Sequence, residues 1–208
     1  SITLAAYLRL ATGRFARLIG AIYRFPIFIP FVVVAQMMNT FLAPHGLLNI
    51  FLAQIGLLDL EAPLQFFNWK GLTFGFVWKQ AAFMTLIILS GFKMVDDSYI
   101  EAARSVGARL PQVIIRILVP MSLATISVAV ILAFTSTVGT FTLPYMLIAG
   151  EPTTVTVDIA HRVNYFGDWG VANALGAITY LMVLATAVYY LRYTVRKGIY
   201  EYQEGAGE

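Results

Sequence analysis

Long apolar stretches separated by short charged segments dominate this sequence. Four of them lie at about 18–42, 71–92, 121–148 and 171–191, and the last two contain no charged residue. A helix that spans a bilayer needs roughly 20 mostly apolar residues, so each stretch predicts a membrane span. Residues 1–10 predict the end of a further span, which we expect to be incomplete at its N-terminus. The pattern therefore predicts an all-α integral membrane protein, with one transmembrane domain over residues 1–208.

Composition favours a bilayer over water as the solvent of this chain. Of its 208 residues, 59% are apolar and 12% are charged, and the mean hydropathy is +0.77. Soluble domains carry about 25% charged residues, so a soluble enzyme is disfavoured. The sequence has no cysteine and only two histidines. This excludes thiol nucleophiles, disulfide frameworks and multi-histidine metal sites, and we expect no metal site.

The basic residues of the loops indicate the orientation in the membrane. Ten of them lie in alternate segments, which must share one side, whereas the opposite loops hold only Lys70 and Arg162. Basic loops stay in the cytoplasm, so we expect the C-terminus to be cytoplasmic and the charge to reflect topology rather than a nucleic-acid partner. The ten are Arg9, Arg14, Arg17, Lys93, Arg104, Arg109, Arg116, Arg192, Arg196 and Lys197.

The cytoplasmic loop at 93–120 predicts two short helices joined by a glycine. Asp96, Asp97 and Ser98 are candidate N-caps, and Glu101 follows Ser98 by three residues, as in a capping box. Gly107 suits the position just after a helix C-terminus. Pro111 suits the first turn of a second helix, at about 112–118.

This loop resembles the EAA loop of permease subunits from binding-protein-dependent ABC importers, the MetI-like family. The matching residues are Glu101, Ala102, Ala103, Gly107, Ile117 and Pro120, and Val119 stands where the family usually has Leu. The resemblance implies that this segment, including Arg104 and Ala108, docks on an ATP-binding subunit. It also implies about six helices in the full chain, of which four complete helices and one partial helix lie here.

The resemblance further implies the partners and the location of the chain. They are an ATP-binding subunit dimer, a second permease subunit that is identical or homologous, and an extracytoplasmic substrate-binding protein, all at a prokaryotic inner membrane. No cofactor is expected on this chain, since it lacks a GxxxxGK[ST] phosphate loop. ATP and Mg²⁺ would bind the partner.

Two other function classes make different demands on the sequence. A channel or an ion-driven secondary transporter is the alternative to the importer, and it predicts carboxylates inside the spans. An intramembrane enzyme would need a paired acid and base or a metal site at depth. No Asp or Glu lies in the four apolar stretches, which disfavours both.

Polar residues within the spans are the candidates for a substrate pathway. Lys79 lies deep in its stretch, where an ionisable side chain usually faces a cavity or another helix, although it could also snorkel to the surface. Polar residues such as Gln36 and Asn39 suit interhelical hydrogen bonds equally well. A polar run before Pro144 predicts a kink or break, and broken helices often line cavities. The pathway candidates are Lys79, Gln80, Gln36, Asn39, Thr137 and Thr140.

The substrate class is indicated only by local resemblances. The outer segment with Gly46, Asn49 and Leu52 is similar to a G-x-x-N-x-x-L region of sugar and polyamine permeases. The segment from Asp168 to Leu175 is more similar to polyamine-type or iron-type permeases. We therefore expect a small organic cation such as a polyamine, with a sugar as the alternative.

The orientation can be tested with single cysteines, because the chain has none of its own. We expect Gly107→Cys and Glu151→Cys to react with an impermeant maleimide from opposite sides of the membrane, Gly107→Cys from the cytoplasm. Labelling of both positions from one side would contradict the predicted topology.

Overall fold

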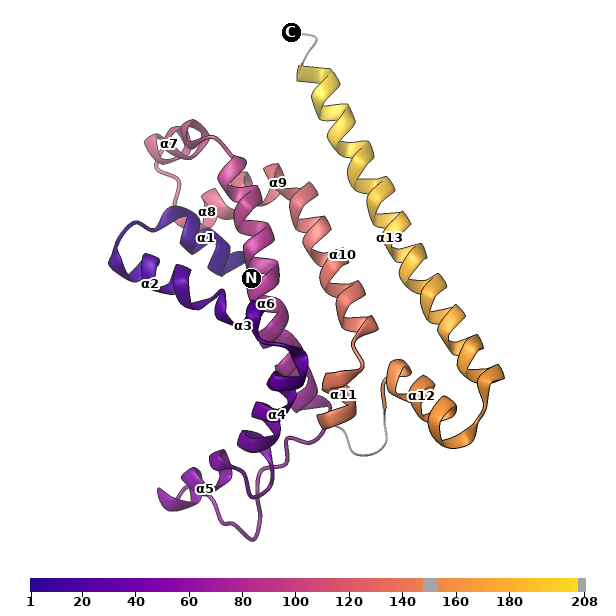
Figure 1. Cartoon of the computed structure of the whole chain (residues 1–208). Helices are drawn as coiled ribbons and strands as arrows, with labels where there is room; N and C mark the ends of the chain where they lie inside the picture. Colours follow the sequence, from indigo (N-terminus) through magenta and orange to yellow (C-terminus); the bar gives the residue numbers. More distant parts are fainter. Residues whose placement is uncertain (148–152, 206–208) are drawn as a thin grey trace. The chain divides into compact units, whose positions relative to one another are not determined.

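The computed structural model describes residues 1–147 and 153–205, and all regular secondary structure in that part of the chain is helical (Figure 1). Its elements are α1 (Ile2–Leu10), α2 (Arg14–Ile22), α3 (Phe25–Phe28), α4 (Phe31–Leu42), α5 (Leu47–Gln54), α6 (Trp69–Met94), α7 (Asp97–Ser105), α8 (Leu110–Val113), a π-helical segment (Ile114–Leu118), α9 (Val119–Met121), α10 (Leu123–Gly139), α11 (Thr142–Leu147), α12 (Val155–His161), a second π-helical segment (Arg162–Phe166) and α13 (Trp169–Gly205).

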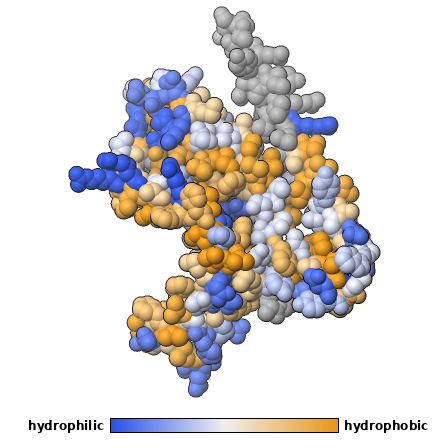
Figure 2. All heavy atoms as spheres, in the orientation of Figure 1, coloured by the Kyte–Doolittle hydropathy of each residue, from blue (hydrophilic) through white to orange (hydrophobic). Residues whose placement is uncertain are grey.

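Within residues 1–147 and 153–205, three helical segments are long and apolar enough to cross a bilayer. They are Phe31–Gln54, which combines α4 and α5, then Trp69–Met94 and Trp169–Tyr190. A fourth candidate is the bent pair Leu110–Met121 and Leu123–Gly139. Large apolar side chains are exposed along these helices, and hydrophobic surface covers much of the face visible in Figure 2. Such a surface suits lipid or a protein partner rather than water.

The prediction of one continuous span over 18–42 is wrong. That stretch is divided into α2, α3 and α4, and the candidate span begins at Phe31. The break has a local cause, since Pro30 is the N-cap of α4 and has no N–H with which to continue a helix from α3.

Two of the other predicted spans differ from the structure only at their ends, and the third is divided. The stretch 71–92 lies within α6, and the stretch 171–191 lies within the longer α13. The stretch 121–148 divides into α10 and α11, so the kink expected before Pro144 is confirmed; residue 148 itself lies outside the described residues.

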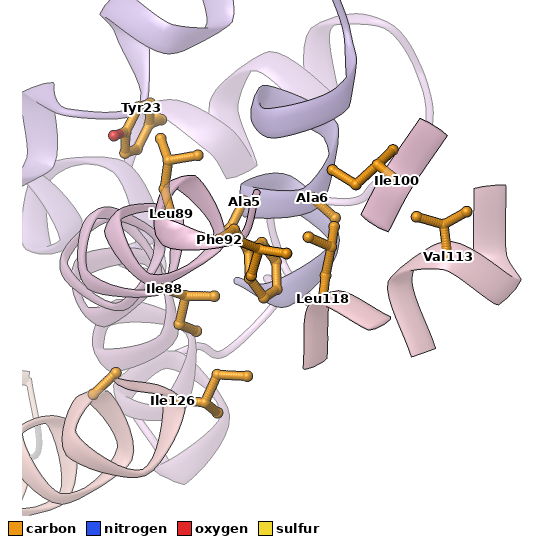
Figure 3. Close-up of a cluster of buried hydrophobic side chains, with 12 residues drawn as sticks. Ala5, Ala6, Tyr23, Ile88, Leu89, Phe92, Ile100, Val113, Leu118 and Ile126 are labelled. Carbon is orange, nitrogen blue, oxygen red and sulfur yellow. The ribbon is translucent and has the colours of Figure 1, made fainter. Parts of the chain in front are cut away.

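The chain divides into two compact units, each with its own core. The first contains residues 1–25, 80–135 and 183–208, and the second contains residues 26–79 and 136–182. In the first unit Ala5 and Ala6 of α1 pack against Ile88 and Phe92 of α6, next to Leu118 (Figure 3). Alanines let the two helix backbones approach closely, as is common between membrane helices. The core of the second unit joins α4, α6 and α11 through Val34, Ala35, Met38, Leu72, Leu143 and Leu147.

Within the second unit, the G-x-x-N segment at residues 46–49 stabilises the loops around α5. The buried Asn49 amide donates hydrogen bonds to the carbonyls of Ala43 and Leu64, and its side-chain oxygen accepts one from the Leu64 N–H, at 3.0–3.1 Å. Gly46 has no room for a side chain, because a Cβ would lie 2.8 Å from the carbonyl oxygens of Thr40 and Phe41. These two residues fix the loops on both sides of α5.

We expect Asn49→Leu to destabilise the protein by about 1–3 kcal/mol, because it leaves buried backbone groups without partners. The measurement is the thermal unfolding midpoint of the detergent-solubilised chain. The control is Gln54→Leu on the same helix, where the side chain is exposed. Equal midpoints for the two variants would contradict this role of Asn49.

Candidate functional site

Helix α7 begins at a defined cap. Asp96 is its N-cap, and a carboxylate oxygen of Asp96 accepts a hydrogen bond of 2.8 Å from the Ser98 N–H. Hydrogen bonds from the Ser98 backbone and side chain hold the pKa of Asp96 below its ordinary value. The capping box expected from Ser98 and Glu101 is therefore wrong. The chain enters the helix two residues earlier, so Ser98 already lies in the first turn.

Helix α7 ends in a Schellman turn at Gly107. The Gly107 N–H donates to the Arg104 carbonyl at 2.9 Å, and the Ala108 N–H donates to the Ala103 carbonyl at 3.0 Å. Gly107 has φ of +82°, in the left-handed region that favours glycine. The predicted helix boundary at Gly107 is confirmed, and the turn depends on this residue.

A second helical segment follows directly and leads towards α10. The Gln112 side chain accepts a hydrogen bond of 2.7 Å from the Arg109 N–H, and Pro111 lies in the first turn, as predicted. Ile117 lies in the π-helical segment and Pro120 in α9. The axis then bends by 78° where α9 meets α10. Residues 97–121 thus form two helices joined at Gly107, which we call the elbow.

The elbow has one face in the core and one face exposed. Ile100 is buried, and Ala103 and Ala108 pack at the edge of the same core. The exposed face of α7 carries Tyr99 and Ala102, and Val106, the C-cap of α7, is 85% exposed. Leu110 and Ile115 continue the exposed apolar surface beyond Gly107. Exposed apolar side chains that lie together on a charged segment such as the elbow are typical of a protein contact surface.

Charged residues border this apolar surface. Glu101 and Arg104 are both exposed, one turn or less from Ala102. Within the part of the chain that the structure describes, neither forms an ion pair. Their charges are therefore available to a partner protein.

Arg9 fixes the elbow to the rest of its unit, and sequence reasoning missed this role. Its guanidinium donates to the carbonyls of Phe92 and Val95, at 2.9 and 3.0 Å, and forms an ion pair with Asp97. The Arg9 side chain is only 15% exposed. It therefore links α1 to the end of α6 and to the first residue of α7. From the sequence, Arg9 is only one of the basic residues that indicate the cytoplasmic side.

Lys79 is buried and bound to backbone carbonyls. Its ammonium donates to the carbonyls of Pro26, Ile27 and Ile29, all around the break between α3 and α4, and it lies 5.2 Å from the centre of the Phe31 ring. The short helix and Pro30 leave these carbonyls without helical partners. The geometry therefore assigns Lys79 to the helix break, one of the interhelical roles expected from its depth.

The remaining pathway candidates lie on several elements. Gln80 donates to the Ala133 carbonyl at 3.0 Å, which joins α6 to α10 in the first unit. In the second unit, Thr140 lies at the break after α10, and its carbonyl accepts a hydrogen bond from Thr156. Gln36 is exposed, and Asn39 and Thr137 are half-buried. Their role in a substrate pathway stays a prediction.

Comparison with known proteins identifies the family. The sequence profile described as "Binding-protein-dependent transport system inner membrane component" matches residues 1–204. The chain belongs to this family. The fold class and the family resemblance derived from the elbow residues are thereby confirmed.

Individual members of the family resemble the chain at moderate identity. The trehalose/maltose transport system permease protein MalF of Thermococcus litoralis is 32% identical over 119 residues, which cover 56% of this chain and 40% of that protein. The spermidine/putrescine transport system permease protein PotB of Haemophilus influenzae is 27% identical over 162 residues, which cover 77% and 52%. The matches thus span about half of these two relatives or less.

The fold is shared with solved transporter structures. A chain in the crystal structure of a bacterial alginate ABC transporter, in complex with its alginate pentasaccharide-bound periplasmic protein, superimposes with a TM-score of 0.77. The match covers 91% of this chain and 68% of that chain, at 23% identity. This likeness establishes the fold of the family member described here.

We expect Lys79→Met to destabilise the protein by about 1–3 kcal/mol, because the carbonyls around the α3–α4 break lose their donor. The measurement combines the thermal unfolding midpoint with amide hydrogen exchange, which should quicken in residues 25–35. Lys70→Met, at an exposed position on the same helix, is the control. Unchanged stability together with altered substrate affinity would instead assign Lys79 to the pathway.

Proposed function

We propose that this chain is the membrane-spanning permease subunit of an ATP-driven, binding-protein-dependent importer. The observation that carries the proposal is the elbow. Its two helices are joined by a turn that depends on Gly107, and Arg9 fixes the start of the first helix. The elbow exposes Tyr99, Ala102 and Val106 outside the candidate spans. Family membership over residues 1–204 supports this proposal.

In the proposed mechanism the elbow docks on an ATP-binding subunit. Closure of two such subunits around ATP would move the elbow. Because Arg9 and the core residues Ile100 and Leu118 join the elbow to α1 and α6, that movement would reach the helices around the substrate pathway. The chain lacks a phosphate loop, so ATP hydrolysis takes place on the partner.

The remaining partners follow from the same proposal. A second permease subunit, identical or homologous, would complete the pathway. An extracytoplasmic binding protein would deliver the substrate to the side opposite the elbow. The complex would lie in a prokaryotic inner membrane with the C-terminus in the cytoplasm, as the distribution of basic residues indicates.

For the substrate we propose an uncharged sugar ahead of a polyamine, which reverses the order expected from the segment at Asp168. A cationic polyamine favours carboxylates along its path, because a buried cation needs a negative partner. The helices α4, α6 and α10 contain no Asp or Glu. The similarity to a trehalose/maltose permease supports the same order.

We expect Gly107→Val to abolish uptake and to release the ATP-binding subunit during purification, since a branched residue at φ +82° costs about 1–3 kcal/mol and misdirects the elbow. Gly56→Val is the matched control: Gly56 also has positive φ, at +72°, and open space around it, but lies outside the elbow.

A second variant, Glu101→Lys, reverses an exposed charge without backbone strain. It should uncouple ATP hydrolysis from substrate transport, while the chain still inserts into the membrane and folds. Normal uptake and normal copurification with both Gly107→Val and Glu101→Lys would refute docking through the elbow.

The substrate class is tested by ATPase activity of the reconstituted complex with its binding protein. We expect stimulation by a neutral sugar from a panel of trehalose, maltose and glucose, and none by spermidine. Stimulation by spermidine alone would restore the polyamine assignment.

A further inference from the structure

A basic cavity lies within the first unit, between α1, α2 and the end of α6. Its volume is about 530 Å³. Among the residues whose side chains the structure describes, three basic ones line it, Arg17, Arg24 and Lys93, and no acidic one does. Like charges gathered around one space repel each other, so the cavity favours an anionic occupant.

No described acidic side chain neutralises the charges in this cavity. Within the residues whose side chains the structure describes, Arg17, Arg24 and Lys93 form no ion pair, and Arg24 donates to the hydroxyl of its neighbour Tyr23 and lies over that ring. Arg9 nearby is different, because two carbonyls and Asp97 surround its guanidinium. The cavity thus has donors for an anion, whereas the Arg9 site is already satisfied.

Helix α2, which forms one wall of the cavity, has the pattern of a helix that lies in a membrane surface. Phe15, Leu18 and Ile22 recur at helical spacing and are each more than half exposed. Arg14 and Arg17 lie on the adjacent row. Hydrophilic side chains next to hydrophobic ones are visible over the position of α2 (Figure 2). A short helix with an exposed apolar row beside arginines is typical of the lipid headgroup region.

We propose that this cavity binds the phosphate headgroup of an anionic phospholipid. The exposed apolar row of α2 brings the cavity to the headgroup level, where basic pockets of membrane proteins hold anionic lipids. The lining also contains the apolar residues Leu8 and Leu89, which suit the glycerol and upper acyl region of a lipid and not a free phosphate ion.

The test uses the full chain in detergent with added phosphatidylglycerol or phosphatidylcholine, and native mass spectrometry to count retained lipid. We expect selective retention of phosphatidylglycerol. Arg17→Gln and Lys93→Gln should each weaken it roughly fivefold, as expected for loss of one basic residue near an anionic headgroup. Arg14→Gln is the matched control, because Arg14 is exposed on the same helix but does not line the cavity.

Three results would overturn the proposal. One is equal retention of the two lipids, and another is the same weakening by Arg14→Gln as by Arg17→Gln, which would indicate diffuse attraction. The third is stabilisation by millimolar inorganic phosphate equal to that by phosphatidylglycerol, which would assign the cavity to a free anion. If Arg17→Gln does not fold, Lys93→Gln, which changes a different helix, decides the outcome alone.

Discussion

This fold depends on hydrogen-bond donors for the backbone carbonyls at the ends of its helices. In a bilayer an unpaired carbonyl finds no water, and each one costs free energy unless the protein supplies a donor. This chain interrupts its helices repeatedly and places a polar side chain at several of the interruptions. Lys79 serves the break between α3 and α4, Arg9 the end of α6, and Asn49 the loops around α5. These polar side chains therefore stabilise the interrupted helices of this chain.

The same constraint explains how the elbow is held. Arg9 uses carbonyls at the end of α6 as acceptors and Asp97 as a charge partner, so one side chain joins three elements. At the other end of α7, the Gly107 turn satisfies the carbonyls of Ala103 and Arg104. With both ends fixed, the proposed force from an ATP-binding subunit would move the elbow as one body.

Local patterns in the sequence were sufficient to predict the two helices of the elbow and their junction. Gly107 and Pro111 act through backbone geometry within a few residues, so the two helices and their junction could be predicted. The choice between Asp96 and Ser98 as the N-cap could not, because both are good caps and the end of α6 determines where the chain enters α7. Pro26 and Pro30 were visible in the stretch 18–42, but the length of the apolar run suggested a single span.

No local sequence pattern predicts the contacts between residues that lie far apart in the chain. Arg9 lies 83 residues from Phe92, and Lys79 lies 53 residues from Pro26. The depth of Lys79 predicted that it needs partners, and only the fold identifies them. The cavity of Arg17, Arg24 and Lys93 likewise requires α2 and α6 to meet. The positive-inside pattern named these residues as topology signals without indicating that they converge.

The most direct test of the account is site-specific cross-linking of the elbow. A single Val106→Cys, at a side chain 85% exposed, would carry a photoreactive maleimide in the assembled complex, with Phe15→Cys, 67% exposed on α2, as the comparison site. The account predicts an adduct with the ATP-binding subunit from position 106 and none from position 15. An adduct from position 15 alone would show that the ATP-binding subunit docks elsewhere and contradict the proposed role of the elbow.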